Sequence, residues 1–254
     1  MGSPPSYEEA SAGDAGFSGP SSSAPTDLPP AYHEQRYDPD EIMQPTIYVL
    51  ADDHIFAESR SGSPRYRLSR VIHAQGKATS TIELSRVDKR IRELSDGTPN
   101  VTTRERHIYN MHYLTHFREA LQCEVKSVAA RGIGRVLVQK SPFPYSGYRA
   151  IKVPVELEST PEKLDKSTYM YAIKEKKDMF EWCGADGKVV ATEVCRDGER
   201  MLLVAVPLTR RHLDGLIALW CLWMWYNHVK DIKDPSMSGW ADGACRSSLL
   251  SIRD

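Results

Sequence analysis

The sequence lacks the long apolar runs that mark membrane and secreted proteins. Its 254 residues begin without an apolar stretch of the signal-peptide type, and the unbroken apolar stretch at 216–226 has only half of the ~20 residues that a bilayer requires. The five cysteines form an odd set without a Cys-x-x-Cys pair. These absences predict a reduced cytoplasmic protein, either free or held at a membrane surface.

Catalytic and metal-binding motifs are also missing. No Gly-x-Ser-x-Gly elbow occurs, and the glycine pair at 132–134 lacks both the Gly-Lys-Ser/Thr ending and the following helix of a phosphate loop. His107, His112 and His116 lie close together, but no glutamate follows His112 as a zinc protease would require. We therefore expect no enzyme activity, no metal and no cofactor.

Charge divides the chain into two parts. Residues 1–45 hold eight acidic residues and one basic residue, Arg36, whereas residues 46–254 hold 32 basic and 26 acidic residues. A net charge of +6 spread over the second part is too dilute to predict nucleic-acid binding, which needs a basic stripe with interleaved aromatic residues. It is compatible with a weak preference for anionic surfaces.

The acidic first part, residues 1–45, is also rich in proline, serine and glycine. It holds eight of the 16 prolines and shows neither helical nor strand periodicity. Such a segment buries too little apolar surface to offset the entropy of ordering, so we expect it to be disordered. Within it stand two copies of one motif, Pro4-Pro5-Ser6-Tyr7 and Pro29-Pro30-Ala31-Tyr32.

This motif has the form that WW domains bind. Two successive prolines hold the backbone near polyproline II, so a WW domain can clamp them between aromatic rings and seat the tyrosine at little entropic cost. The two copies predict a partner with tandem WW domains, the commonest of which are ubiquitin ligases. The predicted contacts are Pro4, Pro5, Tyr7, Pro29, Pro30 and Tyr32. The alternative is a solvated linker without a partner.

The second part reads as a β-barrel. About twelve short runs of β-branched and aromatic residues lie between turn signals, and Asp96-Gly97, Asp186-Gly187 and Asp197-Gly198 suit tight hairpins. We expect a closed antiparallel barrel over residues 46–230. The expected strands are 47–50, 54–57, 66–71, 81–87, 104–111, 124–129, 136–139, 149–157, 168–173, 179–183, 188–194 and 201–206.

One helix is expected, over about 209–229. Its apolar residues cover every face of a helical wheel, as in a helix buried on all sides. Thr209 suits the N-cap, with Leu208 and Leu213 at the positions of a hydrophobic staple. The helix would thread the barrel with Leu216, Leu219, Trp220 and Trp223 in the core. A membrane span and a ligand-lined cavity are the alternatives.

The order of these elements resembles the tubby C-terminal-like superfamily, which includes tubby, the phospholipid scramblases and the plant LURP-one-related proteins. The stretch 182–225 matches best, with a tryptophan-ended strand, the turn at Asp186-Gly187-Lys188, the strand at 201–206 and the apolar helix; 47–68 resembles the family's first hairpin. Small fungal proteins of this barrel type are also similar. The resemblance implies a closed barrel around a hydrophobic C-terminal helix, over residues 46–230.

The resemblance to tubby also implies binding of phosphoinositides or other anionic lipids through basic residues of the barrel surface. The alternative is that these residues form an ordinary solvated face. The candidates are Arg65, Arg67, Arg70, Lys89, Arg90, Arg92, Lys174, Lys176 and Lys177. Scramblases share the proline-rich tail, but this chain lacks their clustered cysteines and an Asp-x-Asp-x-Asp-Gly calcium loop, which argues against scramblase-like activity.

Together these features predict a non-enzymatic adaptor whose tail recruits WW-domain proteins to a tubby-like barrel. The alternative is a peripheral, anionic-lipid-binding or scramblase-like membrane protein. Residues 231–254 carry mixed signals and are expected to form a C-terminal tail.

Overall fold

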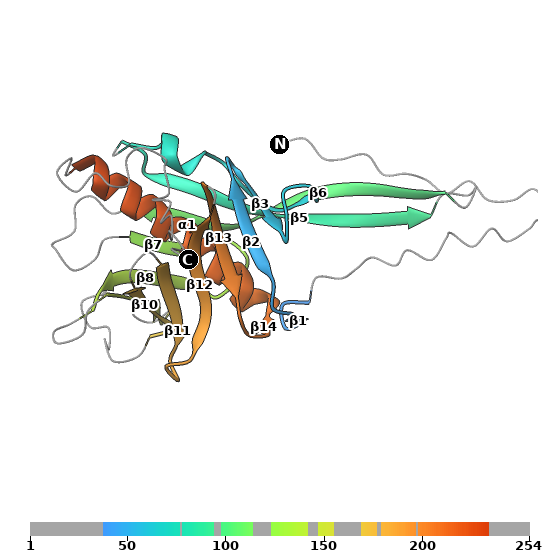
Figure 1. The fold of residues 1–254 in the computed structure, drawn as a ribbon. Helices are drawn as coiled ribbons and strands as arrows, with labels where there is room; N and C mark the ends of the chain where they lie inside the picture. The colour runs from blue at the N-terminus through green and yellow to red at the C-terminus, as the bar shows by residue number, and fades with distance from the viewer. Residues whose placement is uncertain are drawn as a thin grey trace, which may run out of the picture. The chain divides into compact units, whose positions relative to one another are not determined.

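A computed structural model of the chain describes residues 38–76, 78–93, 98–113, 123–141, 147–154, 169–176, 179–196 and 198–233 (Figure 1). Both Pro-Pro-x-Tyr motifs and the predicted C-terminal tail beyond residue 233 lie outside these residues. The described part is mainly β, with one long helix at its C-terminal end.

The strands form the closed antiparallel barrel that the sequence predicts. Each of the twelve expected runs overlaps one barrel strand of the described chain, and the pairings of β9 with β10 and of β13 with β2 close the ring. The strands are β2 (Ile47–Ala51), β3 (His54–Ala57), β4 (Pro64–Leu68), β5 (Thr81–Glu93), β6 (Pro99–Tyr113), β7 (Cys123–Ser127), β8 (Arg135–Lys140), β9 (Tyr148–Val153), β10 (Tyr171–Lys176), β11 (Met179–Gly184), β12 (Val189–Arg196) and β13 (Glu199–Val204).

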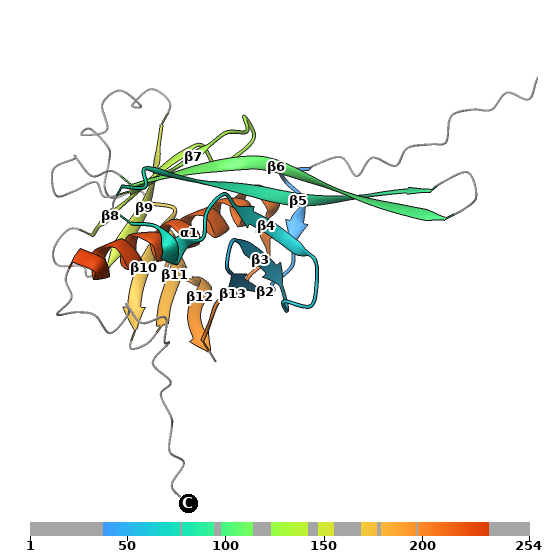
Figure 2. The ribbon, with the colours of Figure 1, turned by 90° about the horizontal axis from the view of Figure 1, so that it is seen from above.

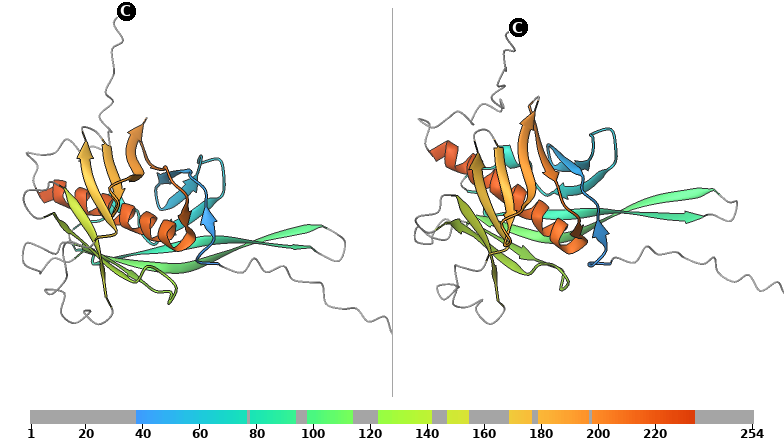
Figure 3. Two further views of the ribbon diagram at one scale, coloured as in Figure 1. Left: turned by 90° about the horizontal axis from the view of Figure 1, so that it is seen from below. Right: turned by 60° about the horizontal axis from the view of Figure 1, so that its bottom comes forward.

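Helix α1 (Arg210–Lys233) runs through the barrel, with strands on its several sides in the views of Figures 2 and 3. The expected helix ended at 229, so α1 ends four residues later. Leu216, Leu219, Trp220 and Trp223 are all buried. Because water would otherwise reach some face of this all-apolar helix, the barrel wall has to surround it.

Alternation along the strands supplies the inner wall. In β5, Ile82 and Leu84 are fully buried while Glu83 between them is exposed. Side chains of a strand alternate between its two faces, so in β5 one face belongs to the core and the other meets water. In β8, by contrast, Val136, Leu137 and Val138 are all buried, so both faces are covered there. The core is therefore one cluster built from nearly every strand and the helix.

A second, two-stranded sheet lies at the start of the helix. Strand β1 (Ile42–Met43) pairs antiparallel with β14 (Leu208–Thr209), directly before α1. A short 3-10 helix, η1 (Ile72–Ala74), follows β4. The folded body therefore includes residues 38–45, which the composition had assigned to the tail, because their partner strand lies more than 160 positions later in the chain.

Tight turns join the strands where the sequence places glycine. Gly187 connects β11 to β12 with a φ of +77°, and Gly198 precedes β13 with a φ of +80°. Gly134 lies between β7 and β8 with a φ of +83°, so the glycine pair at 132–134 belongs to a hairpin connection and not to a phosphate loop. The Asp96-Gly97 turn lies outside the described residues.

Strands β5 and β6 continue past the barrel as a two-stranded ribbon (Figures 1 and 2). β4 pairs with β5 only at 84–86, and β7 pairs with β6 only from Tyr109 onward. Among the described residues, those further out, 87–93 and 99–105, pair only with each other. The sequence predicted two strands here, at 81–87 and 104–111, but not the extension.

A close approach between the helix and the β7–β8 connection fixes their spacing. A Cβ atom on Gly215 would stand 2.4 Å from Cδ1 of Ile133. Ile133 is buried, and its backbone N–H donates to the Tyr109 hydroxyl at 3.2 Å. Since Ile133 and Tyr109 are packed in the core and cannot easily move, position 215 has room only for a hydrogen atom.

We expect Gly215→Ala to destabilise the protein by about 1–3 kcal/mol through overpacking, although alanine favours a helix by about 1 kcal/mol. Urea unfolding would measure the free energy of unfolding. Gly76→Ala is the control, because nothing lies within 4 Å of the added Cβ there. In an Ile133→Ala background, Gly215→Ala should cost less than it does in the parent, because the clashing side chain is gone. A stabilised Gly215→Ala variant would contradict the packing argument.

Candidate functional site

The predicted WW-binding residues, from Pro4 to Tyr32, all lie outside the described residues, and so does Lys177. The structure can therefore place only the other predicted contacts and the surfaces of the barrel. We consider first the basic residues, then the polar groups at and inside the barrel.

The described basic candidates do not form one patch. Arg65 and Arg67 lie on β4 and Lys89, Arg90 and Arg92 on β5, whereas the two lysines of β10 stand six strands from β4 in either direction around the ring. A separation of six strands in a ring of twelve puts these lysines on the opposite side of the barrel from β4. The sequence grouped these residues by charge alone, and the strand order separates them.

Neighbouring carboxylates neutralise part of this charge. Arg67 contacts Glu105 at 3.0 Å and Asp53 at 3.4 Å, and Lys176 contacts Glu181 at 2.7 Å. Arg70 lines a surface depression with the hydroxyl-bearing residues Ser69, Thr79, Ser80 and Thr81, but Glu83 also lines it. These arrangements are those of a solvated strand face with exposed ion pairs.

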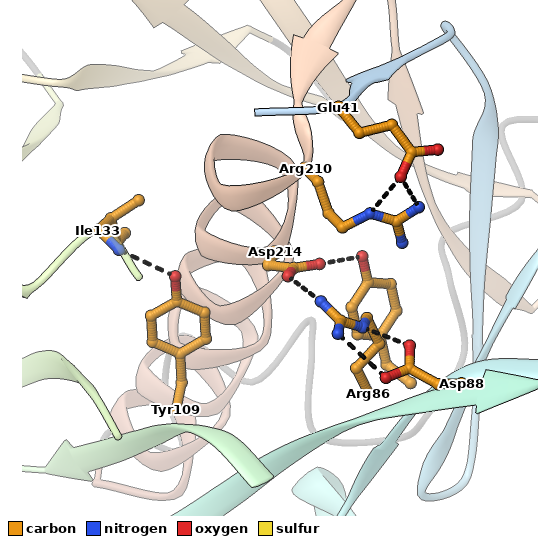
Figure 4. A network of polar contacts seen from close by, with 8 residues as sticks. Glu41, Arg86, Asp88, Tyr109, Ile133, Arg210 and Asp214 are labelled. Carbon is orange, nitrogen blue, oxygen red and sulfur yellow. Dashed lines mark hydrogen bonds and ion pairs between the residues drawn. The ribbon is translucent and has the colours of Figure 1, made fainter. Parts of the chain in front are cut away.

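The start of α1 is held by the segment that precedes β1. The backbone N–H groups of Arg210 and Arg211 donate to the carbonyl oxygens of Glu41 and Pro39, at 2.8 and 3.0 Å. The Arg210 side chain binds the Glu41 carboxylate (Figure 4), and the Arg211 side chain binds Asp40 at 3.0 Å. The two carbonyl oxygens satisfy two N–H groups that a helix leaves open, and the two carboxylates complement its positive end.

Thr209 stands directly before this helix, as expected of an N-cap residue, and its hydroxyl lies 2.7 Å from Nδ1 of His212. Burial and the neighbouring Arg211 lower the pKa of His212. A neutral ring suits this site, since Arg210 and Arg211 already supply positive charge.

A buried ion pair links α1 to the barrel wall. Arg86 Nη1 donates to Asp214 Oδ2 at 2.8 Å, and the side chains of both residues are at most 4% exposed (Figure 4). The Tyr66 hydroxyl donates to the other carboxylate oxygen at 2.8 Å, and Asp88 accepts two hydrogen bonds from Arg86. Two carboxylates therefore bind one guanidinium, and one phenol binds the buried carboxylate.

The electrostatics of this group are those of a structural network. Burial raises the pKa of Asp214, although Arg86 and the hydrogen bond from Tyr66 act in the opposite direction. Burial, followed by the charge of Asp214, raises the pKa of Tyr66 well above its ordinary value. Sequence patterns alone assigned Asp214 no role. A carboxylate in a helix apolar on every face is a signal for a buried partner.

A second buried carboxylate, Glu193 on β12, faces the middle of the helix. Arg200 Nη1 lies 3.1 Å from Oε1, whereas Oε2 and the nearby Trp220 Nε1 have no hydrogen-bond partner in the described chain. Burial raises the pKa of Glu193 to about 7, while Arg200 lowers it less. The charge of Glu193 in turn adds to the raised pKa of the buried Cys221 thiol.

An aromatic cluster fills the barrel around the later turns of α1. The ring centroids of Tyr148 and Trp223 are 4.7 Å apart, and Trp223 also stacks on Tyr226 with a centroid distance of 5.5 Å. Phe180 meets Trp223 edge to face at 5.3 Å, and the Tyr148 and Tyr226 hydroxyls are 3.1 Å apart. Because these rings pack against one another, this part of the interior is a core and not the lining of a ligand cavity.

The cysteines and histidines offer no reactive set within the described chain. Cys123 and Cys221 are buried free thiols whose pKa burial raises, which disfavours the nucleophilic thiolate. Cys195 is disulfide-bonded, which differs from the reduced state that the sequence predicts. His107 and His112 lie on a strand and bond to Asn110 and Thr81.

Among the described residues, no three His, Cys, Asp or Glu side chains gather as metal ligands would. The same part of the chain contains no helix with the length and apolarity of a membrane span.

No family model matches the chain, and no curated protein or solved structure gives a significant match. The barrel around a C-terminal helix is the architecture that the tubby-like resemblance implies. Membership of that superfamily stays a prediction, since an architecture alone does not identify a family.

Arg86→Met is expected to destabilise the protein by about 3–5 kcal/mol, because it leaves Asp214 buried without its cation. Chemical denaturation would measure the loss. The double variant Arg86→Met/Asp214→Leu should recover much of this stability. Arg67→Met, which breaks exposed ion pairs, is the control and should change stability little. A single variant as stable as the parent would show that the buried pair is not needed.

The stability of the protein should fall between about pH 4.5 and pH 7 because of Glu193. Its pKa is about 7 in the fold and near 4.5 when unfolded, so the folded state binds more protons over this range. The loss amounts to roughly 3 kcal/mol and is complete above pH 7. Unfolding at several pH values should show a shallower decline for Glu193→Gln; an unchanged slope would contradict the assignment.

Proposed function

We propose that this chain is a non-enzymatic adaptor whose N-terminal segment recruits WW-domain proteins. The observation that carries the proposal is the pair of Pro-Pro-x-Tyr motifs, at 4–7 and 29–32, in one proline-rich acidic segment. Each motif combines a preformed polyproline II segment with a tyrosine, which are the two features that the groove of a WW domain binds.

The spacing of the motifs favours a partner with two WW domains. The tyrosines are 25 positions apart, and a flexible chain of that length has a root-mean-square span of roughly 25–30 Å. Two small neighbouring domains can be engaged over such a span, and the second contact then forms at a high effective concentration. Tandem WW domains occur in ubiquitin ligases, so the segment would act as an adaptor arm or as a handle for degradation.

The barrel supports a binding role in a different way. Its interior is occupied by α1 and the packed aromatic rings, and the described cysteines and histidines form no catalytic set. Partners therefore have access to the outer surface of the barrel and to the N-terminal segment. In this proposal the barrel is the cargo or platform that the segment connects to a ligase.

The test is binding of the full chain to a tandem WW protein, measured by calorimetry. Tyr7→Ala and Tyr32→Ala should each weaken binding by about tenfold or more, and the double variant should lose it, because avidity requires both sites. Tyr37→Ala is the matched control, since Tyr37 lies in the same segment outside either motif. Undiminished binding by the double variant would remove the proposal.

Binding of anionic lipid is the alternative function. Its support is the three basic residues Arg65, Arg67 and Lys89 on the adjacent strands β4 and β5. The alternative predicts salt-sensitive flotation of the full chain with phosphatidylserine vesicles, reduced by charge reversal at Arg65 and Lys89. Absence of flotation at low salt would exclude it.

A further inference from the structure

The outer part of β6 presents an open strand edge. Residues 100–107 are paired with β5 on one side, and among the described residues no strand pairs with them on the other side, because β7 joins β6 only from Tyr109. Residues 100–105 are all exposed. An open edge of eight residues carries unpaired N–H and C=O groups that can template another strand.

The two faces of this edge differ in charge. Counting alternate positions along β6, Asn100, Thr102, Arg104 and Arg106 belong to one face. Residues that pair directly across the ribbon lie on the same face. Arg104 pairs with Asp88, and Thr102 pairs with position 90, an arginine, so most basic positions of the ribbon belong to the face of Arg104. Asp88, the acidic residue in register there, already binds Arg86.

The opposite face of the edge is less charged and partly apolar. It carries Val101, whose side chain is 54% exposed, together with Thr103 and Glu105. Glu105 contacts Arg67 of β4 at 3.0 Å and is neutralised by it. Val101, Thr102 and Thr103 are β-branched, a residue type that packs well against a neighbouring strand.

We propose that the outer edge of β6, residues 100–107, binds an extended acidic peptide segment of a partner protein as an added strand. The backbone of the segment would pair with the open edge, and a carboxylate of the segment would meet the exposed Arg104. Guanidinium–carboxylate contacts are charge-assisted, so they select acidic segments in one register.

A peptide fits this edge better than nucleic acid or lipid does. Positions 100–107 contain no Phe, Tyr or Trp on which bases could stack. A membrane or a phosphate chain would use the arginines but would leave the backbone edge and the β-branched face unused. The proposal is independent of WW recruitment, because it involves neither Tyr7 nor Tyr32.

The experiment uses the full chain and a labelled octapeptide in which glutamate alternates with threonine or valine, with binding followed by fluorescence anisotropy. We expect saturable binding that Arg104→Glu weakens by about tenfold or more. Lys89→Glu is the matched control: it makes the same charge change on the same ribbon, at a position of the other face, and should have much less effect. If charge reversal disturbs folding, Arg104→Gln removes the positive charge without reversing it and should also weaken peptide binding.

A second probe separates strand addition from simple charge attraction. The same peptide with alternate backbone nitrogens methylated keeps its carboxylates but cannot complete a ladder, so its binding should be lost. Equal binding of the methylated peptide would overturn the proposal, as would no saturable binding at about 1 mM. Binding of duplex DNA or phosphatidylserine vesicles that depends on Arg104, without peptide binding, would assign the face to those ligands instead.

Discussion

The rest of the structure depends on the need to cover a helix that is apolar on every side. A helix with one apolar face needs one neighbour, whereas α1 requires a closed wall, and twelve antiparallel strands supply it. The filling is dense in tryptophan, and four indole N–H groups inside it have no acceptor in the described chain. The wall is therefore held by apolar contact, and its few buried charges have to be matched individually, as Asp214 is by Arg86.

A filled interior moves recognition to the outside of the protein. Lipocalin-like barrels use their lumen for ligands, but here the lumen holds the chain's own helix and its aromatic neighbours. What remains for partners is the outer surface, the N-terminal segment with its two tyrosine motifs, and the ribbon that β5 and β6 extend beyond the wall. The two tyrosine motifs are short linear sequences, so their binding would not depend on the folded barrel. The strand edge of β6 depends on the folded ribbon.

The local patterns of the sequence predicted much of this fold. Alternation and turn residues located all twelve barrel strands, and the unbroken apolar stretch predicted the internal helix to within four residues of its end. The basic residues were a different case. Arg67 and Lys176 resemble each other in sequence, yet they stand on opposite walls and each contacts a carboxylate, because strand order and cross-strand partners decide a side chain's surroundings. The predicted WW contacts lie outside the described residues, so their assignment still rests on the sequence.

By itself the sequence determined the elements: their type, their approximate limits and the burial of α1. These follow from the periodicity of apolar side chains, which is a property of neighbours along the chain. Only the tertiary structure decided that residues 38–43 hold the start of the helix, that Asp214 pairs with Arg86, and that part of β6 has no second neighbouring strand within the described chain. Each of these depends on contacts between residues far apart in sequence, or on a missing neighbour, and neither leaves a trace in local periodicity.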